Sequence, residues 1–202
     1  MRKEIIELIE NILPKYDEVE VKYGGHGREH IKDVITKSYN MAIEFKQNPE
    51  VCCVAALLHD IGLLTTSRKY HHIGSGIYVM EHIEMLQKYF NDEEIYIIFK
   101  AVIEHRSKFN GEYFSMISKI VSDADRSSNI VLMITRSYEY NKPNYNGIEL
   151  QNVVYEHLKE KYYDRQYSFI SKELQHDLDE ARKILSNREL FNQYYDKITN
   201  NK

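Results

Sequence analysis

The amino-acid sequence predicts an all-α fold, and two observations support that prediction. Apolar residues recur at helical spacing along almost the whole chain. Only 8 Gly and 3 Pro occur among 202 residues, which leaves few of the turns that a β fold needs. We therefore expect a compact helical bundle in a single domain, residues 1–202. Its motif-bearing core would span about 20–140, and a helical C-terminal part would span about 148–198.

An apolar stripe marks each helix that we expect in the N-terminal half. Residues 2–13 form the first helix, which Pro14 stops. A glycine-rich loop at 24–27 leads into the second helix. Residues 50–61 form a third, which is apolar nearly all round and should therefore be buried and central. A fourth spans about 72–90, and the residues expected to face inward are Ile73, Ile77, Met80, Ile83 and Leu86.

Polar and turn-forming residues separate the remaining helices. Asn91 caps a helix whose apolar stripe ends at His105. After a loop at 106–114, one helix should run from about 115 to 138. A break at 142–147 then precedes two or three helices that are rich in tyrosine and charge.

Composition and charge argue against several functional classes. With 27 basic and 31 acidic residues the net charge is −4, so the chain lacks the basic surface of a protein that binds nucleic acid duplexes. No apolar run reaches the length that spans a bilayer, and residues 1–4 do not begin a signal peptide. Adjacent Cys52 and Cys53 indicate buried thiols of a reducing compartment. We expect a cytoplasmic protein without a membrane partner. The oligomeric state stays open, with a homo-oligomer as one alternative.

Several segments place a histidine or aspartate at a helix end or at an inward-facing position. These residues are His30, His59, Asp60, His72, His105 and Asp125. A buried carboxylate is costly unless it is paired or binds a metal, which makes His59-Asp60 at the end of an apolar helix unusual. Each residue alone could be a hydrogen-bonded core residue, a helix cap or half of an ion pair. Together they predict one metal site at the centre of a helical bundle.

The order and the context of these residues resemble the HD superfamily of metal-dependent phosphohydrolases. LLHDIG at 57–62 looks like the central motif of that family. GHGREHIKDV at 25–34 resembles its first-histidine segment, and SDADRSSN at 122–129 resembles the segment that supplies its last aspartate. The resemblance covers about residues 20–140. It implies the helical bundle of HD domains.

Neighbouring residues compete for two of the ligand positions, and the resemblance favours one of each pair. It favours His30 over His26 and Asp125 over Asp123. Imidazole and carboxylate ligands together suit Fe, Mn, Ni, Co or Zn better than Ca. We therefore expect a divalent transition metal, as one or two ions.

Two further segments resemble HD proteins that hold two metals. One is His72-Ile-Gly-Ser-Gly76, and the other is Ile103-Glu-His-Arg106. His71 is the alternative to His72 as the ligand of the first segment, and the spacing of that segment favours His72. The resemblance implies that Asp60 bridges two ions, with His30, His59 and Asp125 holding one and His72 and His105 holding the other.

The resemblance implies metal-dependent hydrolysis of a small phosphate ester or anhydride, with a nucleotide as the expected substrate. Asp60 would take part in catalysis. Arg106 and Arg126 are the candidate cations for the transferred phosphoryl group. Arg106 and Asn129 are the candidate substrate contacts.

Departures from two relatives narrow the expected activity. Arg106 and Gly111-Glu-Tyr113 differ from the HD-GYP signature of cyclic-dinucleotide phosphodiesterases. Residues 62–65 lack the acidic pair of the alarmone hydrolases. The pattern is closer to compact stand-alone bacterial HD hydrolases. Two other functions are retained as alternatives. One is a di-iron HD-fold oxygenase, which His72 and His105 would permit, and the other is a non-catalytic nucleotide-binding HD module.

Overall fold

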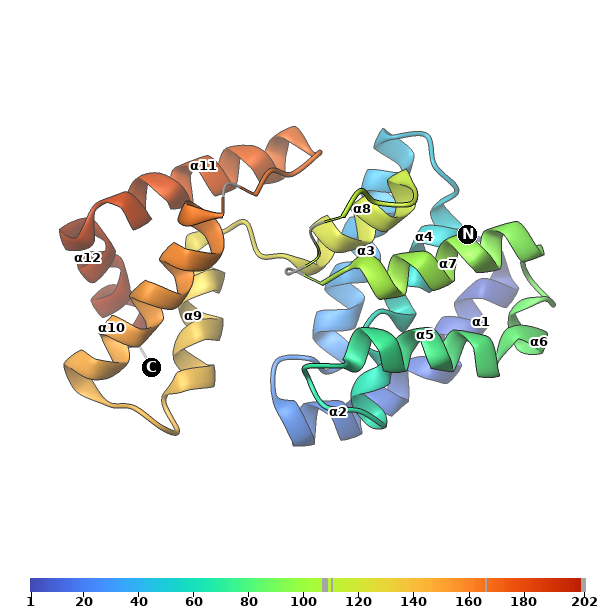
Figure 1. The fold of residues 1–202 in the computed structure, drawn as a ribbon, viewed down its shortest axis with the longest axis horizontal. Helices are drawn as coiled ribbons and strands as arrows, with labels where there is room; N and C mark the ends of the chain where they lie inside the picture. The colour runs from blue at the N-terminus through green and yellow to red at the C-terminus, as the bar shows by residue number, and fades with distance from the viewer. Residues whose placement is uncertain (107–108, 110, 166, 201–202) are drawn as a thin grey trace. The chain divides into compact units, whose positions relative to one another are not determined.

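The computed structural model describes residues 1–106, 109, 111–165 and 167–200. The described residues form helices and no strand, which confirms the all-α prediction. They divide into two compact units, Met1–Arg126 and Ser127–Lys202 (Figure 1). The expectation of one domain stays a prediction, and each unit has apolar side chains buried within it. No helix in the described part of the chain is long and apolar enough to cross a membrane.

The first unit contains the helices that carry the sequence motifs. In chain order they are α1 (Lys3–Ile12), α2 (Tyr16–Tyr23), α3 (Arg28–Glu44), α4 (Pro49–Leu58), α5 (His71–Glu81), α6 (Ile83–Leu86), α7 (Asp92–Glu104) and α8 (Met116–Asp125). Short 3₁₀ turns follow α1 and α4, at Leu13–Lys15 and Ile61–Leu64. The expected boundaries hold for α1, α3 and α4 to within a few residues, but α2 was not expected. Part of the expected loop 106–114 lies outside the described residues.

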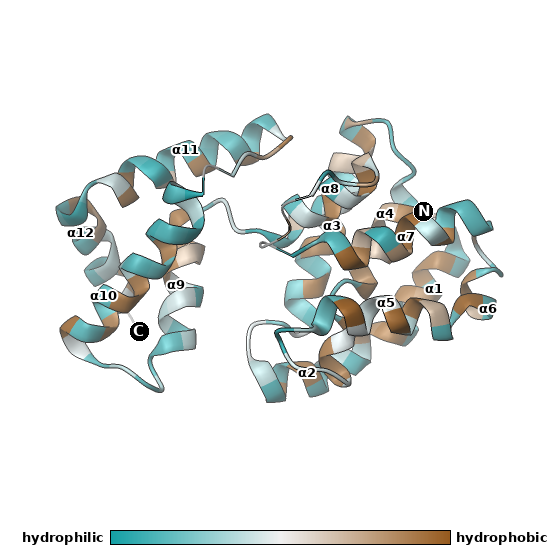
Figure 2. Cartoon of the chain, viewed as in Figure 1, coloured by the Kyte–Doolittle hydropathy of each residue, from teal (hydrophilic) through white to brown (hydrophobic). Residues whose placement is uncertain are grey.

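Helix α4 is the centre of the first unit, as its composition predicted. Every residue from Val51 to Leu58 is buried, and α3, α7 and α8 pack against the helix. Asn48 caps it, because its side chain accepts hydrogen bonds from the first backbone amides. Cys52 and Cys53 are free thiols inside this helix, and burial raises the pKa of Cys53 to about 12. Figure 2 shows further apolar residues, in brown, along α5 and α7.

The helix expected over 72–90 is wrong in extent, and of the five residues expected to face inward only Leu86 is buried. His82 ends α5, and the short α6 follows. Ile73, Ile77 and Met80 were expected to face inward but are 48%, 51% and 52% exposed. Small residues form the packed face of α5 instead, which lets this helix approach its neighbours closely. The buried residues of α5 are Gly74, Ser75, Gly76 and Val79.

The single helix expected over 115–138 is also wrong. Helix α8 ends at Asp125, because Arg126 has extended backbone dihedral angles. A new helix, α9 (Ile130–Asn141), starts in the second unit. The Asn129 side chain caps it by accepting from the amides of Val131 and Leu132.

The second unit consists of helices packed around a core of their own. After α9 come α10 (Gly147–Leu158), a π-helical segment (Lys159–Asp164), α11 (Lys172–Ser186) and α12 (Arg188–Thr199). Aromatic rings are central to this core: the ring centroids of Tyr155 and Phe191 lie 4.9 Å apart, edge to face. The helices confirm the expected helical C-terminal part.

Candidate metal centre

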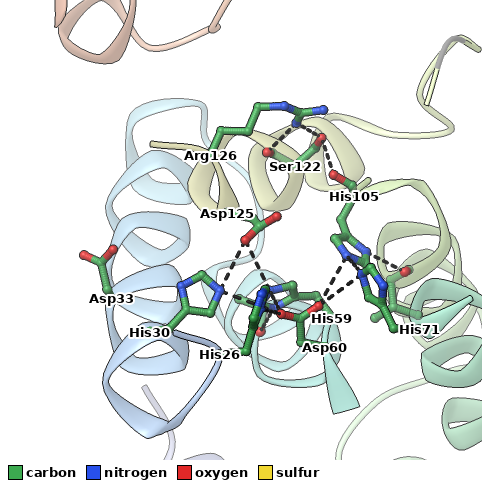
Figure 3. A network of polar contacts seen from close by, with 12 residues as sticks. His26, His30, Asp33, His59, Asp60, His71, His105, Ser122, Asp125 and Arg126 are labelled. Atoms are coloured by element: carbon green, nitrogen blue, oxygen red, sulfur yellow. Dashed lines mark hydrogen bonds and ion pairs between the residues drawn. The ribbon is translucent and has the colours of Figure 1, made fainter. Parts of the chain in front are cut away.

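Side chains from five helices of the first unit converge at the end of the central helix α4 (Figure 3). His30 is in the first turn of α3, and His71 is the first residue of α5. His59 follows α4 directly, and His105 follows α7. The complete group is His26, His30, His59, Asp60, His71, His105 and Asp125.

One set of ligand atoms surrounds the carboxylate of Asp125. Its Oδ1 atom lies 3.2 Å from Nε2 of His30 and 3.5 Å from Nε2 of His59. The Oδ2 atom of Asp60 lies 3.4 Å from Nε2 of His59. Ligand bonds of about 2.0–2.2 Å place neighbouring ligands of one ion roughly 3.0–3.5 Å apart. This set therefore has the spacing of a metal site.

A second set surrounds the other oxygen of Asp60. Its Oδ1 atom lies 3.2 Å from Nε2 of His71 and 3.6 Å from Nε2 of His105. The two histidine Nε2 atoms are 2.9 Å apart. The carboxylate of Asp60 thus presents one oxygen to each set, which is the arrangement of a bridging ligand.

Backbone carbonyls select the tautomer of three of these histidines. The Nδ1 atom of each lies within hydrogen-bonding distance of the carbonyl three residues earlier in the chain. A ring nitrogen that contacts a carbonyl must carry the proton, so in the neutral ring Nε2 is the atom with the free lone pair. The pairs are His59 with Ala56 at 2.7 Å, His71 with Arg68 at 2.6 Å, and His105 with Val102 at 2.8 Å.

Several nitrogen atoms at the centre therefore lack a proton donor. The Nε2 lone pairs of His71 and His105 face each other with no proton between them. Nε2 of His59 and both ring nitrogens of His30 are buried and make no hydrogen bond of good geometry among the described residues, although both Nε2 atoms face the Asp125 carboxylate. A buried polar atom left unpaired costs about 1–3 kcal/mol. A cation would satisfy these atoms, so the residues present fit a divalent metal.

The charges of the site also suit a cation. Burial lowers the pKa of His30 and lowers that of His71 to about 4, so both are neutral near pH 7. Burial alone would raise the pKa of Asp60 and Asp125, but the charge of His59 and the nearby histidine nitrogens hold both pKa values well below the ordinary range. The same two carboxylates outweigh burial at His59 and raise its pKa. Both aspartates are therefore ionised.

The comparisons with known proteins agree with this geometry. The family model of the HD domain matches residues 27–130, just over half of the chain. The chain belongs to the HD domain family. HD domains form a superfamily of metal-dependent phosphohydrolases that bind divalent metals, and the expected membership is confirmed. Neither the curated proteins nor the solved structures gave a match to this chain.

A glycine in the HD motif brings α5 to the site. A Cβ atom on Gly62 would lie 2.1 Å from the carbonyl oxygen of His71 and 2.4 Å from the amide nitrogen of Ser75, so only glycine fits there. The Ser75 hydroxyl accepts from the Gly62 amide at 3.0 Å and donates to the His59 carbonyl at 2.7 Å. These contacts tie the first turns of α5 to the end of α4.

The geometry of this HD domain favours His71 as a ligand, in place of the expected His72. His71 lies among the ligand atoms, whereas His72 lies outside both sets. Successive residues of a helix point about 100° apart, so only one of the two can face Asp60. Burial and the charge of Arg106 lower the pKa of His72 to about 4. The spacing of the His72–Gly76 segment could not resolve these neighbours, because the choice depends on which face of α5 packs towards Asp60.

The choices of His30 over His26 and of Asp125 over Asp123 stay predictions, and the geometry agrees with both. His30 faces Asp125, and Asp125 faces two histidines. Asp123 instead pairs with Lys119 at 2.6 Å. His26 also reaches the centre of the HD domain, with Nδ1 2.7 Å from Oδ2 of Asp60. Sequence reasoning gave His26 no role, although the H-x-x-x-H spacing contains it.

The residues expected to contact substrate make structural contacts. The buried Arg126 donates to the carbonyl and hydroxyl of Ser122 and, at 3.1 Å, to the carbonyl of Arg106. Figure 3 shows its guanidinium turned away from the histidines of the HD site. Arg106 itself donates to the Lys69 carbonyl at 2.7 Å. Asn129 caps α9 in the second unit. The catalytic and substrate-binding roles of these residues stay predictions.

Proposed function

We propose that this HD protein is a metal-dependent phosphohydrolase that acts on a nucleotide or another small phosphate ester or anhydride. The observation that carries the proposal is the position of Asp60. One of its carboxylate oxygens faces Nε2 of His30 and His59, and the other faces Nε2 of His71 and His105. Two divalent ions fit this arrangement, and Fe, Mn, Ni, Co and Zn all accept such ligands.

The chain supplies the ligands and the charge for this chemistry. A bound divalent ion lowers the pKa of a coordinated water and polarises a phosphoryl oxygen. Asp60 and Asp125 stay ionised, and His30 and His71 stay neutral, so all four are in their ligand form near pH 7.

The exposed guanidinium of Arg68 lies beside the site, 2.9 Å from Nε2 of His26. This positive charge favours a phosphorylated substrate. Sequence reasoning did not select Arg68. A small phosphorylated molecule in the cytoplasm, rather than a nucleic acid duplex or a membrane, is the partner that we propose.

The experiment is a phosphohydrolase screen of the protein loaded with each of the five metals. Nucleoside triphosphates, dinucleoside polyphosphates and a chromogenic phosphate ester are the probes. His59→Ala and Asp60→Ala should each lower the activity found by roughly a hundredfold or more, with the helical circular dichroism unchanged. Activity that survives both substitutions would refute the proposal. Oxygen consumption by the iron-loaded protein, without phosphate release, would favour the oxygenase alternative instead.

A further inference from the structure

His26 links the HD aspartate to a charged side chain outside the metal-ligand sets. Its Nδ1 atom is 2.7 Å from Oδ2 of Asp60, and its Nε2 atom is 2.9 Å from Nη2 of Arg68. The residue lies in the loop before α3, just ahead of the part of the chain that matches the HD domain family. Neither the family match nor the motifs assign it a role.

The contact with Arg68 fixes which nitrogen of His26 carries the proton. A guanidinium only donates hydrogen bonds, so Nε2 of His26 must accept. In the neutral ring the proton is then on Nδ1, and His26 donates it to Oδ2 of Asp60. Arg68 thereby holds His26 in the tautomer that can donate to the carboxylate.

This geometry distinguishes His26 from a metal ligand. Nδ1 of His26 lies within ligand distance of atoms of His30 and Asp60, so the three could form a third site. However, 2.7 Å is a hydrogen-bond length, shorter than the other distances between a histidine nitrogen and a carboxylate oxygen at this centre. The permanent charge of Arg68 on the other side of the ring also opposes a cation there. The contact is that of a donor to the carboxylate.

A donor at this place controls how Asp60 is turned. Oδ2 of Asp60 faces His59, and Oδ1 faces His71. The carboxylate can present one oxygen to each of the two ligand sets only while its plane is held in this orientation. The hydrogen bond from His26 uses one lone pair of Oδ2 and so restrains that plane.

We propose that Arg68 and His26 form a positioning pair that holds Asp60 in the orientation required to bridge two metal ions. This inference rests on the proposed two-metal site. Neither residue needs to touch the reacting atoms, and both act through Asp60. The readout is therefore metal binding, measured apart from activity.

The test is a titration of the whole chain with Mn²⁺. Calorimetry measures the binding, and electron paramagnetic resonance detects the bound ions. The wild type should bind two Mn²⁺ and show the spectrum of a spin-coupled pair. His26→Ala should weaken binding by about 10–100-fold and reduce the coupled signal. His26→Asn keeps an amide donor near the position of Nδ1 and should restore most of the affinity. Arg68→Ala should cause a smaller loss.

Arg28→Ala provides the matched control, because the Arg28 side chain is 40% exposed and pairs with Asp17 outside the site. It should leave Mn²⁺ binding unchanged. Wild-type affinities in His26→Ala would overturn the positioning pair, as would His26→Asn that binds no better than His26→Ala. Loss of one whole equivalent in His26→Ala, with the other ion held at wild-type affinity, would make His26 a ligand and also overturn it. A wild type that binds no pair of ions would instead refute the proposed metal site itself.

Discussion

Three histidines of the site have a fixed orientation because each donates a hydrogen bond from Nδ1 to a carbonyl of the preceding turn. The orientation of these rings is therefore set before any ion arrives. His71 is also neutral there, whereas His59, whose pKa the two carboxylates raise, must release its Nε2 proton when an ion binds. Holding a ligand ring in one orientation reduces the entropy lost on binding. The same restraint separates neighbouring histidines into ligands and non-ligands, since only a ring that points at Asp60 can supply a ligand atom.

This separation gives a prediction for the pair His71 and His72. His71→Ala should remove one of two metal equivalents per chain, because it deletes a ligand atom 3.2 Å from Oδ1 of Asp60. His72→Ala should keep both equivalents. Elemental analysis of protein purified without chelator measures this directly. The reverse result would restore His72 as the ligand.

At the scale of elements, the close approach of α5 to the 3₁₀ turn Ile61–Leu64 decides whether the second set of ligands can form. Gly62 permits that approach, and the hydrogen bonds of the Ser75 hydroxyl to the Gly62 amide and the His59 carbonyl stabilise it. Neither contact contributes a ligand atom. Both determine where His71 lies.

Gly62→Ala should therefore selectively weaken the second metal position. Its Cβ would meet backbone atoms of α5 that cannot move aside, so His71 would shift away from Asp60. Gly76→Ala is the matched control, because its Cβ would meet only the side chains of Ile103 and Phe99. Calorimetric titration with Mn²⁺ should show one weakened site in Gly62→Ala and two intact sites in Gly76→Ala. Equal binding by the two variants would contradict this role of Gly62.

A second pair of elements, α1 and α4, is joined at their N-termini by Arg2 and Glu50. Glu50 accepts from the backbone amide and from Nε of Arg2, both at 2.5 Å. Burial raises the pKa of Glu50, but these hydrogen bonds and the charge of Arg2 outweigh it and lower the pKa. A carboxyl whose pKa is lower in the folded state stabilises the fold above its unfolded pKa of about 4.3. That contribution is lost as the pH falls through the folded-state value.

The expected result is a pH-dependent difference in melting temperature between the wild type and Glu50→Gln. The wild type should melt higher at pH 7, and the difference should shrink towards pH 3. Glu10→Gln, an exposed change on helix α1, serves as the control. A difference that stays constant across this pH range would show that the charge of Glu50 is not responsible.

Local signals in the sequence sufficed for some elements and failed for others. The apolar composition of α4 and the cap at Asn91 act within a few residues, so both were predicted correctly. The exposure of Ile73 on α5 depends on packing against distant segments, which periodicity does not report. The break at Arg126 depends on contacts with Ser122 and the Arg106 carbonyl. Likewise, most of the ligands predicted from the sequence lie close together in the structure, but which of His71 and His72 faces Asp60 depends on how α5 packs.

On the scale of the whole molecule, all candidate ligands lie in the first unit, and the second unit has its own core. Phe191→Ala removes the fully buried centre of the second core and should cost about 3–5 kcal/mol of stability. Metal content per chain should nevertheless stay at the wild-type value. Leu58→Ala, next to His59 in the first unit, should cost about 2–5 kcal/mol and lower the metal content. Equal metal loss in both variants would mean that the second unit supports the site.

The ends of the helices add a further effect at this centre. Helices α4, α7 and α8 all finish at the ligands, with His59 and His105 directly after their helices and Asp125 as a last residue. The aligned peptide dipoles of a helix place about half a negative charge at its C-terminus. Three such termini create a field that attracts cations independently of any one ligand. A variant that lacks a single histidine should therefore still bind divalent ions at this point. Only the binding affinity and the number of bound ions should fall.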